Sequence, residues 1–397
     1  MKKAKTVLIS GAGIAGPTLA YWLARYGFIP ALIERAPALR TGGYVVDFWG
    51  AGFDVAERMD LVPALRRDGY KVREVRIVDA SGARVGGFGM AAFRRKLHDQ
   101  FLSIRRGDLA KRIYGTLGNR VETVFGDEIR ALSEEEDSLM VEFDRSPPRR
   151  FDLVVGADGL HSAVRKLAFG PEPRFETYLG YCAAVFAVTG YPYRDEDVYV
   201  AYGAPGKQAA RFALRDGRTV FFLIVSALDK PAIDAHDISG QKEVLRCAFA
   251  NDGWECPQIL NALDQAAELY FDAVSQIRLE RWYRDRVALV GDAAFCPSFL
   301  AGQGSAFAMI GGYVLAGELK RAGGDPAIAY PAYQNHLKPF IEHKRRQAVG
   351  FARQFAPRTR LGLAIRNGLS RLLDAPLLGD LMVERMFADR FALPEYG

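Results

Sequence analysis

The sequence predicts an α/β protein in which a Rossmann-like βαβ unit is joined to a second, mostly antiparallel β domain and to C-terminal helices. Three observations predict this fold class. A glycine-rich turn follows an apolar strand at residues 6–16, short strands fill residues 181–225, and long helical patterns follow residue 302. Antiparallel strands that come after a βαβ block indicate a separate, inserted domain.

The first element is one βαβ unit. Residues 6–10 read as a buried strand, residues 17–26 have helical spacing, and residues 29–33 form a second strand. Gly11, Gly13 and Gly16 stand between the first strand and the helix in the spacing GxGxxG. The first glycine permits a tight turn, the second lets backbone amides approach a pyrophosphate, and the third lets the helix pack on the strand. This context predicts a dinucleotide site.

An acidic residue completes the βαβ pattern. Glu34 ends the second strand, 18 positions beyond Gly16, and can accept hydrogen bonds from ribose hydroxyls. Basic residues 2–5 before an apolar run could also open a signal peptide, but Gly11, Gly13, Gly16 and Pro17 break that run at once. We therefore expect a nucleotide-binding strand and turn here.

The remaining elements follow in order along the chain. Strands are expected at residues 72–78 and 84–88 (a hairpin), 121–125, 139–143, 151–155, 181–188, 198–202, 209–214, 219–225 and 286–290. Helices are expected at residues 53–61, from 105, from 163, and at 241–250, 258–267, 302–320, 330–351 and 361–391, the last broken near Pro376 and Gly379. Asp108 is the expected cap of the helix that opens at Arg105, and the acidic run at 134–137 is expected to be a solvated turn.

Composition excludes several classes of protein. The chain has 397 residues, 49% of them hydrophobic and 25% charged, which is ordinary for globular domains. A net charge of +6 is mild for this length and gives little support for nucleic-acid binding. No apolar run reaches the roughly 18 residues of a membrane span. The four cysteines have neither zinc-site nor disulfide-framework spacing, so we expect no metal and a reducing, cytoplasmic location.

Two further motifs continue the pattern of the first. Gly156-Ala157-Asp158-Gly159 stands on a strand-to-helix turn, and Gly291-Asp292 precedes Gly302-Gln303-Gly304 at the start of a long helix. With GxGxxG and Glu34, these motifs resemble those of the FAD-dependent aromatic hydroxylases, the p-hydroxybenzoate-hydroxylase-like single-component flavoprotein monooxygenases. The resemblance covers roughly residues 1–350 and implies an FAD-binding domain of the GR2 type.

The resemblance also implies roles for single residues. The pyrophosphate turn would be Gly11, Gly13, Ile14, Ala15 and Gly16, and Glu34 with Arg35 would contact the adenosine ribose. Arg106 resembles the family arginine that reaches the FAD phosphate region. Asp158 belongs to a motif associated with both FAD and NAD(P)H, with a helix cap as its alternative role. Asp292 resembles the aspartate that bonds the ribityl chain, and Gly302, Gln303 and Gly304 resemble the flavin-ring contact, where the helix dipole would stabilise reduced flavin.

This chain departs from the family pattern at the third motif. Many relatives have a histidine where Phe295 stands, and a proline where Phe299 and Leu300 stand; the proline here is Pro297. The loop over the flavin is therefore expected to have its own shape. No flavin-linking His or Cys of the family type is present, so non-covalent FAD is expected, and His161 is expected to lie exposed on its turn.

The resemblance implies a monooxygenase. NAD(P)H would reduce FAD, O₂ would form a flavin C4a-hydroperoxide, and an aromatic or polycyclic molecule would be hydroxylated. The N-terminal sequence, from the glycine turn to residues 43–49, resembles that of a subgroup that oxidises polyketides. The tetracycline-inactivating monooxygenases, which are associated with antibiotic resistance, are close to this subgroup. A geranylgeranyl-reductase-like enzyme acting on a lipid-like substrate is the alternative, and a non-catalytic FAD-binding protein is a further one. No residue is nominated as a catalytic acid or base.

The substrate cavity is expected between the flavin and the sheet of residues 180–225. The expected wall residues are Tyr202, Arg211, Phe212, Phe222 and Phe299, and Arg211 would suit an anionic or enol-bearing substrate.

The resemblance also divides the chain. The FAD-binding domain would comprise residues 1–70, 100–175 and 281–330, the substrate domain 71–99 and 176–280, and a C-terminal helical segment 331–397. The last helices resemble the capping helix of some of the tetracycline-inactivating enzymes. A structural helix pair that covers the FAD-binding domain is one alternative, and a membrane-surface role for their arginines is another. A monomer or homodimer without a nucleic-acid partner is expected.

Overall fold

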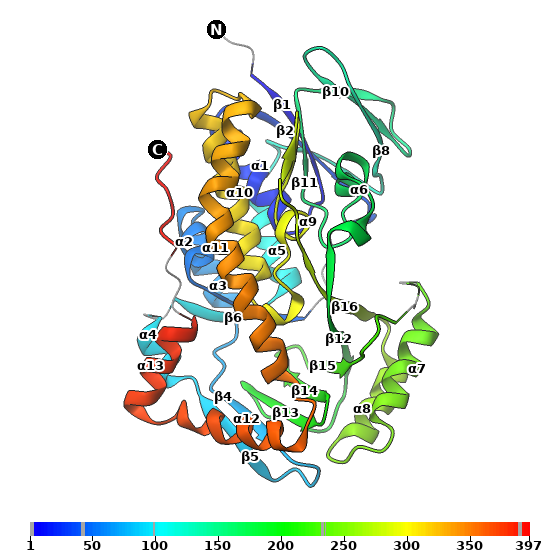
Figure 1. Ribbon diagram of the computed structural model, residues 1–397, viewed down its shortest axis with the longest axis vertical. Coiled ribbons are helices and arrows are strands. Elements are labelled where there is room, and N and C mark those ends of the chain that lie inside the picture. The colour runs from blue at the N-terminus through cyan, green and yellow to red at the C-terminus, as the bar shows by residue number, and fades with distance from the viewer. Residues whose placement is uncertain (1–3, 41–43, 98–99, 232–233, 235, 388–390) are drawn as a thin grey trace.

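The computed structural model describes residues 4–40, 44–97, 100–231, 234, 236–387 and 391–397. Two large sheets occupy opposite ends of the molecule, and the long helices α10 (Gly304–Arg321) and α11 (Pro326–Phe355) run beside them (Figure 1). The mixed α/β fold class is confirmed. Gly43, which opens the stretch similar to the polyketide-oxidising subgroup, lies outside the described residues.

A six-stranded sheet carries the βαβ unit. Its order is β17-β18-β11-β1-β2-β7, and all pairs are parallel except β17 with β18. The strands are β1 (Thr6–Ser10), β2 (Ile29–Glu34), β7 (Glu122–Phe125), β11 (Leu153–Gly156), β17 (Tyr283–Arg284) and β18 (Val287–Leu289). Both faces of these strands are covered, which is why β1, β11 and β18 are continuous apolar runs.

Helices pack on this sheet through small residues. A Cβ on Gly312 of α10 would lie 3.0 Å from the backbone nitrogen of Leu19, so only glycine lets α10 approach α1 (Ala15–Arg25) this closely. The neighbouring helices are α2 (Ala51–Arg58), α3 (Val62–Asp68), α5 (Arg106–Gly115), α6 (Ala163–Phe169) and the short α9 (Asp292–Phe295). The small sheet β8 (Ile129–Glu134), β9 (Leu139–Phe143) and β10 (Arg149–Phe151) joins the same core.

The seven-stranded sheet is mostly antiparallel, as predicted. Its order is β16-β12-β15-β14-β13-β4-β5, with only β13 and β4 parallel. The strands are β4 (Glu74–Val78), β5 (Arg84–Gly89), β12 (Glu176–Thr189), β13 (Val198–Ala204), β14 (Lys207–Ala213), β15 (Arg218–Ser226) and β16 (Leu269–Ile277). Helices α7 (Ile238–Phe249) and α8 (Cys256–Gln265) cover one face, and the other turns toward the nucleotide-binding region (Figure 1).

A two-stranded sheet lies at the boundary between the two regions. It pairs β3 (Val45–Trp49) with β6 (Phe101–Arg105). Its side chains pack with those of the seven-stranded sheet in one apolar cluster that includes Trp49, Phe212 and Val220.

The C-terminal helices lie against the edge of the seven-stranded sheet and against α4. Helix α12 (Arg360–Leu372) packs on β5, and α13 (Pro376–Phe387) packs on α4 (Ala91–Lys96). They run along the outer edge of the seven-stranded sheet (Figure 1). The alternative in which they cover the nucleotide-binding domain is therefore excluded. Polar contacts fix this place: the N–H of Gly87 donates to Ser370 Oγ at 2.8 Å, and the N–H of Gly89 donates to Asp374 Oδ1 at 2.6 Å.

Two smaller expectations are also corrected. Asp108 does not cap α5; it lies in the first turn and accepts from the Arg105 guanidinium at 2.6 Å. Strands β8 and β16 were not predicted; β9 pairs with β8 and β10, and β7 pairs with β2. In the described part of the chain, no helix combines the length and apolar character needed to cross a membrane.

Candidate active site

The glycine turn after β1 is open where a ligand phosphate would lie and crowded elsewhere. A Cβ on Gly11, whose φ is +106°, would lie 2.5 Å from the carbonyl oxygen of Ala157, and one on Gly16 would lie 1.9 Å from the carbonyl oxygen of Gly11. Over Gly13 the nearest atom is Arg106 Nη2, at 3.7 Å from the Cβ position. Ile14 and Ala15 are buried at the start of α1. The turn therefore exposes a helix N-terminus that suits an anion.

Glu34 lies beside this turn. Its Oε2 accepts from the N–H of Ala12 at 2.8 Å, and its Oε1 accepts from the N–H of Ala36 at 2.9 Å. The carboxylate is thus held at the carboxyl ends of β1 and β2, where ligands of open α/β sheets bind. Arg35, the next residue, is exposed.

Arg106 and Asp292 come from distant parts of the sequence and meet near the turn. Arg106 begins α5, and its N–H donates to the carbonyl oxygen of Tyr44 at 2.9 Å. Asp292 begins α9; its carboxylate oxygens lie 3.7 and 3.9 Å from the Cβ position of Gly304. Burial raises the pKa of Asp292, and the nearby charge of Arg106 opposes this rise.

The loop from Gly302 to Gly304 opens helix α10. Gly302 has a left-handed backbone with φ +69°, and Gln303 is buried. Helices α1 and α10 run parallel, since Ala15 lies near Gly291 and Ala308 while Trp22 contacts Tyr313. Two positive helix ends therefore lie on the same side of the molecule, near the buried Asp292.

Asp158 is engaged in holding its own turn. Ser162 Oγ donates to Asp158 Oδ1 at 2.5 Å, and the N–H of Val164 donates to Oδ2 at 3.1 Å. These contacts fix the start of α6, where Ser162 also caps the helix by accepting from Arg165. Burial raises the pKa of Asp158. The observed contacts are those of a helix anchor, and its contact with a cofactor stays a prediction.

An aromatic cluster joins the glycine loop to the seven-stranded sheet. Phe299, just before Gly302, contacts the rings of Tyr44, Tyr270 and Phe222 at centroid distances of 4.8, 5.4 and 5.6 Å. Phe222 also contacts Phe355 at the end of α11, at 5.8 Å. We call Tyr44, Phe222, Tyr270, Phe299 and Phe355 the aromatic junction. Burial raises the pKa of Tyr44 to about 12, so this phenol stays protonated at neutral pH.

Phe212 lies on the same sheet face as Phe222 but farther along it. It is fully buried and packs against Tyr199 at 4.5 Å and Tyr70 at 5.3 Å. The structure therefore brings Phe222 and Phe299 into contact and places Phe212 in the adjoining core.

Tyr202 and Arg211 lie on the opposite face of the sheet, against α7 and α8. Tyr202 donates to Asp252 Oδ1 at 3.3 Å and stacks on Trp254 at 6.0 Å. Strand residues alternate between faces, so these two positions cannot line the same cavity as Phe222. The expectation that they form one wall with Phe222 and Phe299 is corrected.

Arg211 is committed to an ion-pair network. Its Nε and Nη2 donate to Glu255 at 2.7 and 2.9 Å, and Nη2 also donates to Asp195 at 2.7 Å. Glu255 further accepts from Tyr191 at 2.9 Å. A buried arginine with two carboxylate partners holds β14 to α8, and it is not placed to recognise an anionic substrate next to the glycine loop.

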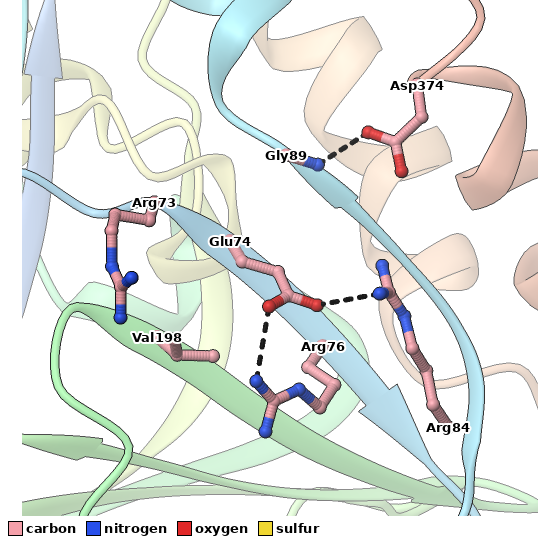
Figure 2. Close-up of a pocket in the computed structure, with 7 residues that line it drawn as sticks. All are labelled: Arg73, Glu74, Arg76, Arg84, Gly89, Val198 and Asp374. Carbon is pink, nitrogen blue, oxygen red and sulfur yellow. Dashed lines mark hydrogen bonds and ion pairs between the residues drawn. The ribbon is translucent and has the colours of Figure 1, made fainter.

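Two hollows on the seven-stranded sheet are lined by paired charges. The larger, of about 400 Å³, lies between β4, β5, β13 and the turn after α12 (Figure 2). There the carboxylate of Glu74 faces Arg76 and Arg84, each at 3.2 Å. Beside them the N–H of Gly89 donates to Asp374 Oδ1 (Figure 2). The smaller, of about 310 Å³, contains Arg211, Tyr193 and Trp254. Neither hollow is lined by a residue of the glycine turn or of the aromatic junction.

His161 is exposed on its turn, as expected, but it is not free. Its Nδ1 lies 2.9 Å from Glu172 Oε1 and its Nε2 lies 3.0 Å from Asp272 Oδ2. It thereby links the turn after β11 to β16 of the other sheet. Within the described residues, no group of three or more His, Cys, Asp or Glu could hold a metal ion, and all four cysteines are free thiols.

Tyr44, Tyr270 and Phe355 were not among the site residues expected from the sequence. Tyr270 stands in β16, whose polar residues Asp272, Ser275 and Gln276 hide the strand pattern. Tyr44 stands in a glycine-bearing loop, where a single tyrosine carries no distinctive signal. They are recognised only in the folded structure, where Tyr44 and Tyr270 contact Phe299 and Phe355 contacts Phe222.

Comparison with known proteins identifies the family. Residues 118–324 match the FAD binding domain family. An uncharacterized protein of Mycobacterium tuberculosis is 38% identical over 86% of this chain and 92% of its own length, and a flavin-dependent monooxygenase of Legionella longbeachae is 30% identical over 100% and 99%. The crystal structure of the tetracycline destructase Tet(55) is similar with a TM-score of 0.85 and 31% identity, covering 100% of both chains. The chain therefore belongs to the FAD-dependent aromatic hydroxylases, and it is an FAD-dependent monooxygenase.

Proposed function

We propose that this enzyme uses NAD(P)H and O₂ to hydroxylate an aromatic or polycyclic, polyketide-like small molecule, with tetracyclines as candidates. The observation that carries the proposal is the aromatic junction. It places Phe299, three residues before Gly302, against Phe222 and Tyr270 of the sheet. A planar substrate that inserts among these rings would lie next to the glycine loop.

The residues present fit FAD. The space over Gly13, the helix end behind it and the Arg106 guanidinium would hold the pyrophosphate, and Glu34 would accept from the adenosine ribose. Asp292 would accept from the ribityl chain, and the backbone from Gly302 to Gly304 would face the ring. When bound, FAD supplies the redox chemistry that activates O₂ for transfer of one oxygen atom.

The chain itself binds, orients and excludes water. The N-terminus of α10 and the nearby Arg106 provide positive potential where reduced flavin would carry negative charge. Tyr44, protonated at neutral pH, can donate a hydrogen bond to an oxygen atom of substrate or cofactor. The half-buried rings of Phe222 and Phe299 would exclude water from the space where the substrate would lie.

Two observations guide the choice between oxygen transfer and reduction of a lipid-like substrate. The relative from Legionella longbeachae, which spans the whole chain, is a flavin-dependent monooxygenase. The aromatic junction offers flat rings that stack with a conjugated molecule, whereas an isoprenoid chain has no such preference. Both favour a monooxygenase with an aromatic substrate.

Tetracyclines enter as candidates through Tet(55), whose likeness extends over the entire chain. They are flat, conjugated and oxygen-rich, which suits a site with stacked rings and a donating phenol. Because Arg211 lies elsewhere, a charged substrate group would have no arginine partner from β14.

The test is NADH and NADPH oxidation, with oxygen uptake, by the FAD-loaded protein in the presence of phenols, aromatic acids and tetracyclines. We expect at least one planar polycyclic compound to stimulate oxidation and to give a product heavier by one oxygen atom in mass spectrometry. Reduction of a lipid-like substrate without oxygen uptake would overturn the proposal. Oxidation that no aromatic compound stimulates would contradict the substrate class.

A further inference from the structure

Helices α12 and α13 present a row of large aliphatic side chains to solvent. On α12, Leu361, Ile365, Leu369 and Leu372 repeat at intervals of four, four and three residues, which places them on one stripe of the helix. Leu377, Leu378 and Leu381 continue the row on α13. Their exposed fractions run from 40% to 87%. We call these seven residues the α12–α13 apolar face.

The orientation of α12 is fixed by polar contacts on its other side. Ser370 accepts from Gly87, Arg371 donates to the carbonyl oxygen of Val85 at 2.9 Å, and Arg366 donates to Gln208 at 3.0 Å. An amphipathic helix normally turns its apolar stripe toward the protein core. Here the stripe faces outward, although burying each such side chain would be favourable. A contiguous exposed patch of this kind marks an interaction site.

The stretch of chain that leads into and forms α12 is rich in positive charge. Residues 344–373 contain Lys344 and seven arginines and no Asp or Glu, although the whole chain has a net charge of only +6. The arginines exposed in this stretch are Arg346, Arg353, Arg358, Arg360 and Arg371.

Helix α13 does carry acidic residues, but they are already paired. Asp380 pairs with Arg95 at 2.7 Å and Glu384 pairs with Lys96 at 2.9 Å, both on α4. Asp374, exposed in the turn between the two helices, accepts from the N–H of Gly89. The solvent side of the two helices therefore combines leucines with exposed arginines.

We propose that the α12–α13 apolar face docks on the surface of a membrane that contains anionic lipid. Leucines inserted at the level of the headgroups and arginines at the phosphates are the two components of interfacial helix binding. The two helices lie along one outer edge of the molecule, so both can meet a surface together (Figure 1). This inference is independent of the substrate.

A second copy of the chain is a poorer occupant. Two-fold pairing would place the same face against itself and bring its arginines together, while Asp380 and Glu384 are already paired with α4. A nucleic acid would complement the positive charge. The leucines, however, would form no favourable contacts with phosphates or base edges.

The test is sedimentation of the full-length, FAD-loaded protein with phosphatidylcholine vesicles made with or without phosphatidylglycerol. We expect binding to the anionic vesicles that weakens as salt is raised. Ile365→Glu should weaken binding about tenfold or more, because it removes one inserted side chain and adds a negative charge. Ile328→Glu, at an isoleucine that is 61% exposed on α11, is the matched control and should bind like the parent protein.

A second variant tests how much the arginines contribute to vesicle binding. The double change Arg353→Gln with Arg360→Gln should weaken binding to anionic vesicles and reduce its salt dependence. Thermal denaturation and bound FAD should match the parent in every variant, since all the changed side chains are exposed.

Three results would overturn the proposal. One is equal binding to neutral and anionic vesicles, and another is no vesicle binding at all. The third is a concentration-dependent dimer in light scattering that Ile365→Glu abolishes, which would assign the face to a second copy. None of these readouts depends on turnover, so they remain distinct from a failure of the proposed hydroxylation.

Discussion

The six-stranded and seven-stranded regions build their sites in opposite ways. Around the six-stranded sheet the candidate site depends on side chains that are missing, at Gly11, Gly13 and Gly16, and on backbone groups left exposed by their absence. At the seven-stranded sheet it depends on side chains that are present, in the aromatic junction. The first region should therefore tolerate no added atoms at Gly11 and Gly16. The second can exchange rings and alter substrate choice while the cofactor site remains intact.

The largest expected effect comes from Gly16→Ala. The new methyl group would lie 1.9 Å from a backbone oxygen, which cannot move aside like a flexible side chain. We expect a cost of about 3 kcal/mol or more, at the upper end for overpacking, and hence about a 100-fold loss of FAD affinity. Bound FAD per protein, measured by absorbance, checks this.

Gly115→Ala is the control for that change. No atom lies within 4 Å of a Cβ at Gly115, so FAD binding and melting temperature should stay at parent values. Full FAD occupancy in Gly16→Ala would show that close packing at this turn does not position the cofactor.

The next prediction concerns Asp47, an acidic residue at the boundary between the two regions. Asp47, in β3, accepts from Ser103 at 2.5 Å, and burial raises its pKa to about 6. The folded state thus binds this proton more tightly than the unfolded state, where the pKa is about 3.9. The group's contribution to stability is full below about pH 4 and is lost as the pH rises through about 6.

Asp47→Asn should therefore raise the melting temperature at pH 8, by an amount equivalent to at most about 3 kcal/mol for two pKa units. The gain should shrink toward pH 5, which thermal denaturation at both pH values would show. Asp137→Asn, at a side chain that is 98% exposed, should show no such dependence. A gain of equal size at both pH values would contradict the raised pKa.

A smaller change should separate the two faces of the seven-stranded sheet. Phe222→Leu removes ring contacts with Phe299 and Phe355, each worth about 1 kcal/mol. We expect the KM for the aromatic substrate to rise about tenfold with FAD affinity unchanged. Tyr202→Phe on the other face should leave KM at the parent value. Equal effects from both changes would mean that both faces contact substrate.

The smallest effect concerns the link between the regions at His161. Two carboxylates, Asp272 and Glu172, raise its pKa to about 10. The stabilising contribution of protonated His161 is therefore fully present below about pH 6.5, the ordinary pKa of histidine. It is lost as the pH rises through about 10. Because the side chain is 55% exposed, solvent screening limits its contribution to below about 1 kcal/mol. Denaturation of His161→Gln should differ from the parent at pH 7 and converge with it above pH 10.

The nucleotide-binding part of this fold could be predicted because its backbone demands glycine. A Cβ at Gly11 or Gly16 is sterically excluded, so the backbone conformation requires glycine at both positions. These glycines can therefore be recognised in the sequence without knowing which residues surround them. Glu34 and Gly304 were found by their spacing in the motifs and not by steric exclusion, since a Cβ at Gly304 would meet nothing closer than 3.7 Å. The convergence of Arg106 with Asp292 rested on the resemblance, since the two are far apart in the chain.

The substrate side could not be predicted in the same way. Both faces of the seven-stranded sheet are covered, so β15 reads as an unbroken apolar run and its alternation does not reveal which face meets the glycine loop. Phe222 and Arg211 therefore look equally suitable in the sequence. The position of α12 and α13 could not be predicted for a related reason: their leucines face solvent, while the polar side of α12 contacts the protein.

Helix α11 has a mechanical consequence. Its 30 residues span about 45 Å at 1.5 Å per residue. Near its start Tyr333 donates to Leu289 of the six-stranded sheet at 3.1 Å, and farther along the Arg345 carbonyl accepts from Gln276 of the seven-stranded sheet at 3.0 Å. The helix acts as a strut that sets the separation of the two sheets. Pro331 and Pro339 each remove one helical hydrogen bond, so any swing of one sheet relative to the other would concentrate bending in this stretch.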